Sequence, residues 1–350
     1  MYSEKSFQIV PFISLYSFTH LVVDAACAFL LLGVLDIHDH PILSILLYNA
    51  IAFVLQAPLG FLIDKGLSPK LAAIAGLIFI IAAFLSGDYL FVALILVSLG
   101  NALFHVGGGS QVLALKEKKA SFTGIYVAPG GIGLVIGSLL AFAPFDTSLL
   151  LFPGLLVVLG AILYFVKTPE FKRVKEPERK KTSSYYIALV ITLILIPIII
   201  RSLIGLSIDF PWKENQLLYL SLVLAIALGK AFGGFLADKF GLEIVGVGGL
   251  LLSMPLLAFC TEIPVLGILG AFIFNFTMPV TLIAILNTIP EKRGLSFGLS
   301  TTALFIGALP VILGHTQWLD NNCVVFSLIL LAAIILLTAF YLTKKNRNGI

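Results

Sequence analysis

Twelve apolar runs, each about 20 residues long, follow one another along this 350-residue chain with only short polar breaks between them. A helix of about 20 residues spans a hydrocarbon core of about 30 Å, so each run is long enough to cross a bilayer. The pattern predicts an all-α membrane protein with twelve transmembrane helices. The runs cover residues 8–35, 41–63, 69–87, 89–114, 121–144, 147–166, 185–208, 216–237, 242–261, 264–288, 295–316 and 323–343.

Composition supports this fold class and argues against a water-soluble domain. Hydrophobic residues make up 59% of the chain and charged residues 11%, whereas a soluble domain has about 45–50% and 25%. With about 29 residues for each helix, little chain remains for an extramembrane domain, and function is expected inside the helix bundle. The HExxH, GxSxG and P-loop patterns do not occur in the sequence, so we expect no enzymatic activity.

The basic residues are distributed asymmetrically about the twelve runs. If the N-terminus is cytoplasmic, nearly all of the 22 Lys and Arg residues fall on the cytoplasmic side, whereas Lys213 lies outside and Arg201 and Lys230 lie within apolar runs. This is the positive-inside bias of membrane proteins. It predicts a multi-pass protein of the cytoplasmic (inner) membrane with both termini in the cytoplasm. The net charge of +4 then needs no nucleic-acid partner.

A polar segment separates the first six runs from the last six. Residues 167–184 contain seven basic residues, three acidic residues and two prolines. We expect a cytoplasmic linker between an N-terminal half, residues 1–166, and a C-terminal half, residues 185–350. The basic linker suits contact with anionic headgroups of the lipid bilayer. A regulatory or partner-binding role for the linker is the alternative.

A short motif recurs at nearly half the length of the chain. GFLIDK at 60–65 returns as GFLADK at 234–239, a shift of 174 positions that also places Asn101 on Asn275. Such a repeat predicts two pseudo-symmetric six-helix halves. In each copy the glycine allows close helix approach, and the aspartate can accept hydrogen bonds from N–H groups at a helix start. The residues of these expected cytoplasmic gate loops are Gly60, Asp64, Lys65, Gly234, Asp238 and Lys239.

The paired motifs, the twelve runs and the basic linker together resemble the major facilitator superfamily of secondary transporters over nearly the whole chain. The resemblance implies the major facilitator fold and alternating access around a central cavity. In the superfamily the motif reads G-x-x-x-D-R-x-G-R-R, and the closing basic pair is absent from both copies here. A charge relay at these loops is therefore expected to be reduced.

Three further segments are similar to fosmidomycin-resistance-type transporters, an efflux branch of the superfamily. They are THLVVDAACAFL at 19–30, GNALFHVGGGSQV at 100–112 and RGLSFGL at 293–299. The branch has Pro-Glu after the Phe-His of its fourth helix, where this chain has Val106 and Gly107. The carboxylate of that glutamate is therefore missing here, and a proton-coupling role assigned to it in the branch does not carry over to this chain.

Three ionisable side chains, Asp24, Arg201 and Lys230, fall well inside apolar runs. Each costs about 2.5–3.5 kcal/mol at a helix centre, so we expect them to face an aqueous cavity or one another. Asp24 and Arg201 are expected to form a charge pair between the halves, either opened by substrate or a proton, or static and important for packing. Lys230 is expected either to bind an anionic group or to extend toward the cytoplasmic surface.

Polar residues at helical spacing mark one face on each of two runs. Tyr16, His20 and Asp24 follow at i, i+4 and i+8 in the first run, and Asn101 and His105 repeat the i, i+4 spacing in the fourth. For the histidines two roles stay open. They bind substrate or transfer protons near neutral pH, or they are satisfied by a neighbouring helix.

By the resemblance, helices 1, 4, 7 and 10 line the cavity, which adds residues from the seventh and tenth runs to these faces. The expected substrate and proton pathway is Tyr16, His20, Asp24, Asn101, His105, Arg201, Lys230 and Asn275. This interior holds one carboxylate, two fixed cations and two histidines that can add positive charge. In a poorly screened space such a balance favours an organic anion over a cation.

The expected function is secondary active transport of a small organic anion by alternating access, coupled to protons, with Asp24 as the leading coupling carboxylate. The protein is expected to act as a monomer. One alternative is a proton-antiport efflux pump for drugs or antimetabolites. The other is a membrane sensor or scaffold that does not transport and binds a partner through the linker.

The remaining motifs predict packing and not chemistry, and neither a cofactor nor a metal is expected. The three cysteines are scattered without a CxxC spacing, and DIHDH at 36–40 is expected to be a solvated loop. Gly133 and Gly137 form a GxxxG pair for close helix contact. The glycines at 107–109 pack closely against a neighbour, bring the backbone near a substrate or break the helix.

Overall fold

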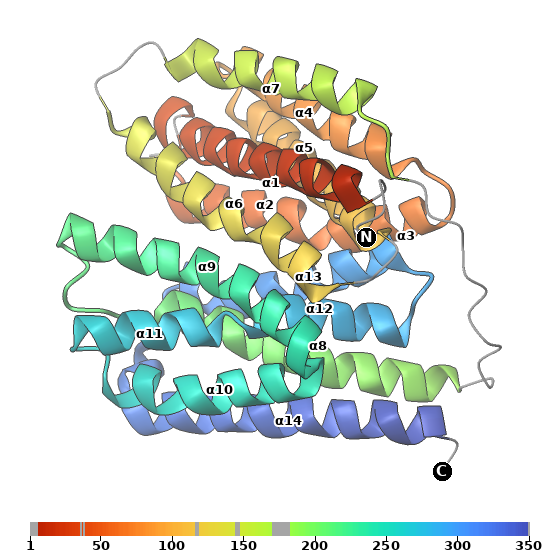
Figure 1. The fold of residues 1–350 in the computed structure, drawn as a ribbon. Helices are drawn as coiled ribbons and strands as arrows, with labels where there is room; N and C mark the ends of the chain where they lie inside the picture. Colours follow the sequence, from red (N-terminus) through yellow and green to blue (C-terminus); the bar gives the residue numbers. More distant parts are fainter. Residues whose placement is uncertain are drawn as a thin grey trace. The chain divides into compact units, whose positions relative to one another are not determined.

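The computed structural model describes residues 6–35, 37, 39–115, 119–143, 148–169 and 183–348, and the regular structure in these ranges is helical (Figure 1). Asp36, His38 and most of the expected linker, residues 170–182, lie outside the described residues. The elements are α1 (Ser6–Phe29), η1 (Leu30–Val34), α2 (Pro41–Asn49), η2 (Ala50–Val54), α3 (Gln56–Asp64), α4 (Pro69–Leu85), α5 (Leu90–Leu113), α6 (Ala120–Ala141), α7 (Ser148–Phe165), α8 (Ser184–Ser207), α9 (Gln216–Phe240), α10 (Leu242–Phe259), α11 (Pro264–Phe274), α12 (Thr277–Thr288), α13 (Arg293–Ile312), η3 (Gln317–Asp320) and α14 (Asn322–Asn348).

These elements confirm the expected fold class. Within the described ranges, ten helical segments are long and apolar enough to cross a membrane, and α4 and the apolar part of α7 add two shorter ones. Together they coincide with the twelve apolar runs. Three spans are composite: α1 continues into the π-helical η1, η2 joins α2 to α3, and α11 is followed by α12.

The tenth span is not the single helix that the run at 264–288 predicts. α11 ends at Phe274 and α12 begins at Thr277, so the helix breaks between them. Pro279 has no N–H to donate to the Asn275 carbonyl four residues earlier, and Met278 N donates to that carbonyl at 3.2 Å instead. In transporters, broken membrane helices occur where backbone lines a cavity or an ion site.

Contacts between Cα atoms divide the chain into two compact units. The first comprises residues 1–115, 125–169 and 292–305, and the second comprises 116–124, 170–291 and 306–350. Helices α6 and α13 therefore each contribute to both units. The division into halves at 166 and 185 stays a prediction.

Small residues bring the helices of the first unit close together. α4 and α5 lie side by side (Figure 1), and a Cβ atom built on Gly76 of α4 would lie 2.5 Å from the backbone nitrogen of Phe104. The glycine run of α5 stays helical, with Gly107 against the Pro69 carbonyl and Gly109 against the Phe297 ring. Close packing of this run is thus observed and a helix break is not, while an approach of the backbone to a substrate stays a prediction.

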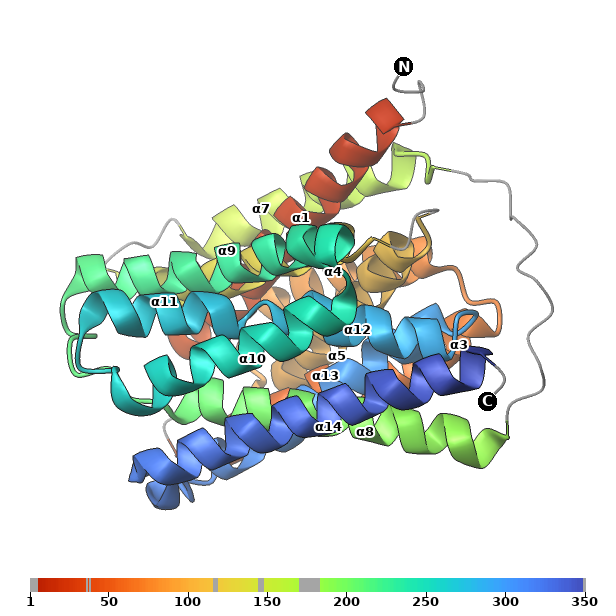
Figure 2. The same ribbon diagram turned by 60° about the horizontal axis from the view of Figure 1, so that its bottom comes forward.

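The second unit is held by similar contacts and by polar bonds near the ends of its helices. α14 packs beside both α8 and α10 (Figure 2). Tyr186 Oη of α8 donates to the Leu342 carbonyl at 2.7 Å, and Lys344 forms an ion pair with Glu243 of α10. On α9, a Cβ on Gly229 would lie 2.2 Å from the Phe272 carbonyl of α11. Close backbone approach of this kind is the usual way for membrane helices to pack.

Candidate functional site

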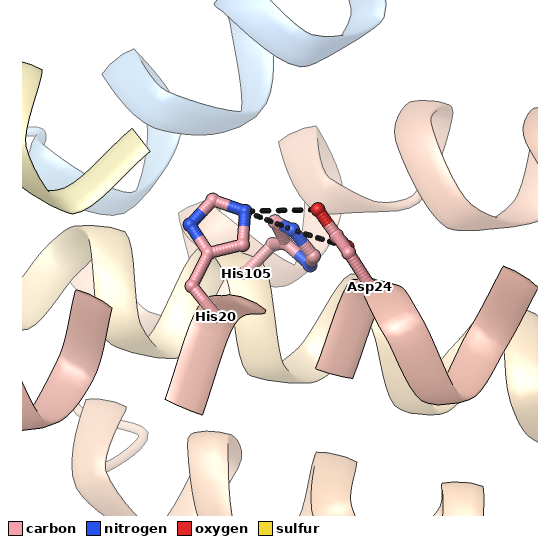
Figure 3. A group of neighbouring side chains, drawn as sticks. All are labelled: His20, Asp24 and His105. Atoms are coloured by element: carbon pink, nitrogen blue, oxygen red, sulfur yellow. Dashed lines mark hydrogen bonds and ion pairs between the residues drawn. The ribbon is translucent and has the colours of Figure 1, made fainter. Parts of the chain in front are cut away.

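Two histidines and one aspartate meet inside the first unit (Figure 3). His20 and Asp24 lie one turn apart on α1, and their Nε2 and Oδ2 atoms are 3.2 Å apart. His105 reaches them from α5, with its Nε2 atom 3.3 Å from Asp24 Oδ1 and 2.8 Å from His20 Nε2. The imidazole side chains are 6% and 11% exposed and the carboxylate 20%. We call these three residues the HDH cluster.

Hydrogen bonds on the far side of each ring determine where the ring protons lie. His20 Nδ1 is 2.8 Å from the Tyr126 carbonyl oxygen, and His105 Nδ1 is 2.9 Å from the Asn101 carbonyl oxygen. A carbonyl oxygen can only accept, so each Nδ1 carries a hydrogen and donates it. In the neutral tautomers that follow, both Nε2 atoms direct a lone pair toward the other ring and toward the carboxylate.

This arrangement needs a cation. Two Nε2 lone pairs and a carboxylate converge within hydrogen-bonding distance, and three acceptors with no donor between them repel one another. An unpaired carboxylate in a membrane interior is also unfavourable by about 2.5–3.5 kcal/mol. A proton on His105 Nε2, for example, turns the contacts of that atom with Asp24 Oδ1 and His20 Nε2 into attractive ones.

A second set of polar groups surrounds the HDH cluster. Asn101 Nδ2 lies 3.1 Å from Tyr48 Oη of α2, 3.5 Å from Asp24 Oδ1 and 3.6 Å from Cys27 Sγ. From α6, Tyr126 Oη donates to the His105 carbonyl at 3.3 Å. Asn101 thus contacts the carboxylate directly, Tyr48 contacts Asn101, and Tyr126 contacts the backbone of His105.

Helix α6 is fitted closely against α1 at this place. A Cβ on Gly133 would lie 2.1 Å from the Leu21 carbonyl oxygen, and one on Gly137 would lie 2.1 Å from that of Ala25. This is the close contact expected for the GxxxG pair. One turn earlier, a Cβ on Gly130 would lie 2.5 Å from both Asp24 Oδ2 and His20 Nε2. Gly130 therefore forms a wall of the HDH cluster.

A proline in α6 supports this fit. Pro129 has no N–H for the Ile125 carbonyl four residues earlier. Ser17 Oγ of α1 lies 3.1 Å from that carbonyl and supplies a donor in its place. The neighbouring Tyr126 carbonyl is the acceptor for His20 Nδ1. Pro129 thus frees the Ile125 carbonyl, which Ser17 of α1 contacts.

Substitution of two of these glycines should have different consequences. Gly133→Ala places a methyl group against the Leu21 carbonyl, which cannot move without shifting α1, so we expect destabilisation by about 1–3 kcal/mol. Gly130→Ala meets only side-chain ends, so the fold should survive while the HDH cluster is displaced. Gly154→Ala on α7, which meets no atom within 4 Å, is the control. Thermal unfolding in detergent measures the first effect, and equal melting of Gly133→Ala and Gly154→Ala would contradict it.

The structure places the remaining pathway residues in two groups. Tyr16 belongs to the first unit, where it is fully buried and its ring packs against Phe12 at 4.8 Å. Arg201, Lys230 and Asn275 belong to the second unit, so the expected Asp24–Arg201 pair stays a prediction.

Arg201 lies half-buried on α8, and its Nε atom is buried with no hydrogen-bond partner among the described residues. Lys230 is half-buried on α9. Asn275 occupies the helix break after α11, where its Nδ2 donates to the Ala271 carbonyl at 2.9 Å. The Arg201 Nε–H is therefore a buried donor in the second unit, and none of the described residues supplies an acceptor for it.

The first copy of the repeated motif binds the start of another helix. Asp64, the last residue of α3, accepts hydrogen bonds at 2.9 Å from the backbone N–H groups of Gly294 and Leu295, at the start of α13. The carboxylate thereby accepts from two N–H groups that have no partner within the helix, and its negative charge is favourable near the positive end of the helix dipole. Gly60 makes the approach possible, because a Cβ there would lie 2.1 Å from the Gly294 carbonyl oxygen.

The second copy makes the same contact in the second unit. Asp238 of α9 accepts from the backbone N–H groups of Ala120 and Ser121, at 2.7 and 3.1 Å, at the start of α6. A Cβ on Gly234 would lie 2.5 Å from the Ala120 carbonyl. Lys65 and Lys239, which follow the two aspartates, place their ammonium groups near the rings of adjacent phenylalanines. The repeat in sequence is thus a repeat in structure.

The polar residues predicted for the pathway on α1 and α5 lie together in the structure, whereas the partner predicted for Asp24 was Arg201 alone. In the structure the carboxylate faces His20 and His105. The contributions of Tyr48, Tyr126 and Gly130 were missed. The role of Gly130 depends on how α6 packs against α1, which the sequence alone does not determine.

The described helices have the major facilitator fold, as comparison with solved structures shows. The chain is similar to the structure of the major facilitator superfamily transporter FucP in its outward conformation, with a TM-score of 0.67 and 15% identity over 97% of this chain and 99% of that one. FucP is the E. coli fucose:proton symporter.

Two further structures are similar over nearly their whole length. For the human organic anion transporter MFSD10 the TM-score is 0.66, with 15% identity over 96% of this chain and 99% of that one. For a bacterial homologue of the iron transporter ferroportin the TM-score is 0.62, with 14% identity over 96% of this chain and 99% of that one. Comparison with protein-family models and with curated protein sequences finds no match. At such identities the likeness establishes the fold.

Proposed function

We propose that this protein is a secondary active transporter that moves a small organic anion across the membrane by alternating access, coupled to protons at the HDH cluster. The observation that carries the proposal is a buried carboxylate faced by two histidine Nε2 atoms at 3.2 and 3.3 Å within a major facilitator fold. Ionisable residues inside membrane spans mark ion and proton pathways, because their burial is otherwise unfavourable.

Coupling requires that the cluster gain and lose its cation, and its surroundings support this. The groups that face Asp24 are His20 and Cys27 on α1 and Asn101 and His105 on α5, with Tyr48 of α2 and Tyr126 of α6 behind them. Neither tyrosine nor cysteine is charged near neutral pH. We take the cation to be a proton, because histidine is the side chain suited to exchange a proton near neutral pH.

Arg201 supports an anionic solute. Its buried Nε–H lacks a hydrogen-bond partner among the described residues, and a buried donor left unsatisfied is unfavourable by about 1–3 kcal/mol. A carboxylate or phosphate oxygen of the solute satisfies that donor and neutralises the guanidinium. The fold itself does not select a solute, because the similar structures include a sugar symporter and an organic anion transporter.

An uptake panel in proteoliposomes tests the proposal. Purified protein is reconstituted and offered labelled organic anions and organic cations, with and without an imposed pH gradient. We expect at least one anion to accumulate above its external concentration when the gradient is present. Transport of organic cations and of no anion would contradict the assignment of the substrate class, and no flux of any solute would favour the sensor or scaffold alternative.

Arg201→Gln should weaken recognition of the anion. The change removes the fixed charge and the buried Nε–H together, and a hydrogen bond to a charged group contributes about 1.5–3 kcal/mol. We expect the KM for the transported anion to rise about 10- to 100-fold. Lys213→Gln, at a partly exposed loop cation beside Asp209, is the control and should leave KM unchanged. Equal KM values for the two variants would remove Arg201 from the solute site.

The proposal also includes the membrane location of the protein, its orientation and the direction of flux. Location in the cytoplasmic membrane with both termini inside follows from the charge bias. Similarity to the fosmidomycin-resistance-type branch suggests export as the direction of flux. Resistance profiling of cells against phosphonate and amphiphilic compounds separates export of such compounds from anion uptake.

A further inference from the structure

The HDH cluster has the composition of a metal site as well as of a proton site. From its geometry we infer that His20, Asp24 and His105 bind one divalent first-row transition-metal ion through the two Nε2 atoms and the carboxylate. The inference concerns binding alone, and it stands whether or not the chain transports an anion.

Distances between the donor atoms are the first argument. The three closest pairs are separated by 2.8, 3.2 and 3.3 Å. A metal ion with bonds of about 2.1 Å to histidine nitrogen and carboxylate oxygen holds neighbouring ligands about 3.0–3.4 Å apart in octahedral or tetrahedral geometry. The cluster is therefore already close to the spacing that such an ion imposes.

The two imidazole rings are oriented as metal-binding histidines are. A metal-binding histidine donates its other ring N–H to a carbonyl or carboxylate, which orients the ring and directs the free lone pair at the metal. Both histidines do this, through Nδ1 to the carbonyls of Tyr126 and Asn101 at 2.8 and 2.9 Å. Because the acceptors are backbone atoms within helices, the rings are held in this orientation by the fold itself.

Ligand chemistry selects the class of metal. Two imidazoles and one carboxylate suit Fe²⁺, Co²⁺, Zn²⁺ and similar ions, whereas Ca²⁺ and Mg²⁺ prefer oxygen ligands alone. Three protein ligands leave coordination positions open, which distinguishes exchangeable sites from closed structural ones. The sequence shows no metal-binding pattern because His20 and His105 lie 85 positions apart on different helices.

Cobalt binding by the purified full-length protein tests the inference. The protein, prepared without a polyhistidine tag and stripped with chelator, is titrated with Co²⁺ and followed by visible absorption and calorimetry. We expect one Co²⁺ per chain, with absorption bands typical of nitrogen and oxygen ligands. Asp24→Asn and His105→Gln should each weaken binding more than about 100-fold, since even outer-shell changes weaken metal sites 10–100-fold.

Two controls make the outcome unambiguous. His315→Gln and His40→Gln remove exposed histidines and should bind Co²⁺ like the wild type. Electron paramagnetic resonance of the Cu²⁺ form needs no variant, and we expect couplings to two imidazole nitrogens. No Co²⁺ binding by the wild type at mildly alkaline pH, or binding that survives both cluster variants, would overturn the inference and leave a proton as the cation of the cluster.

Discussion

Asp24→Asn should abolish gradient-driven accumulation while exchange of preloaded solute continues. Asparagine has the shape of aspartate but no charge, and its Nδ2 group can donate to one of the two histidine lone pairs that face it at 3.2 and 3.3 Å. The HDH cluster then loses the negative charge that favours a bound cation, and it gains a neutral donor. With no cation to gain and lose, solute movement is uncoupled from the gradient.

Proteoliposomes measure this directly. The steady-state solute ratio across the membrane should fall to its equilibrium value in Asp24→Asn, while counterflow of labelled solute persists. Asp209→Asn changes an exposed carboxylate, with a side chain 86% exposed, and should accumulate solute like the wild type. Undiminished uphill transport in Asp24→Asn would exclude Asp24 from the coupling mechanism.

Gly60→Val should reduce transport at least tenfold. The new Cβ would lie 2.1 Å from the carbonyl oxygen of Gly294, a backbone atom that moves only if α3 and α13 separate. Separation also breaks the two hydrogen bonds from the start of α13 to Asp64. Overpacking of this kind is unfavourable by about 1–3 kcal/mol, and the lost bonds to a charged acceptor add to it.

The effect on rate follows from the populations of the transport cycle. If the contact between α3 and α13 stabilises one state of the cycle, each 1.4 kcal/mol lost depopulates that state about tenfold. Gly154→Val, at a position with no atom within 4 Å, is the matched control for the added side chain. Initial rates normalised to the amount of reconstituted protein provide the comparison, and similar rates in the two variants would show that the approach of α3 to α13 is dispensable.

Much of the fold could be predicted from sequence because it depends on local signals. Membrane spans are determined by length and hydropathy, which a single sequence contains, and the repeat of GFLxDK is visible at a constant shift. That the two aspartates act at helix starts also follows from residue chemistry. The partners themselves, α13 for Asp64 and α6 for Asp238, depend on the arrangement of helices far apart in the chain.

The contacts among the polar residues of α1 and α5 could not be predicted, for the same reason. Helical spacing places His20 with Asp24, and Asn101 with His105, each on one face. It does not determine how α1 and α5 are rotated toward each other, and that rotation brings the two Nε2 atoms to 2.8 Å. The helix break near Asn275 was missed because a proline alone does not predict one: Pro197 and Pro310 lie inside helices that continue through them.

The central claim is that solute movement is coupled to the cation of the HDH cluster. The most direct measurement follows internal pH and labelled solute together in proteoliposomes, after a solute gradient is applied without any pH gradient. We expect the wild type to change the internal pH as solute flows, and Asp24→Asn to pass solute with no change in pH. Solute flow through the wild type with the internal pH unaltered would contradict the account.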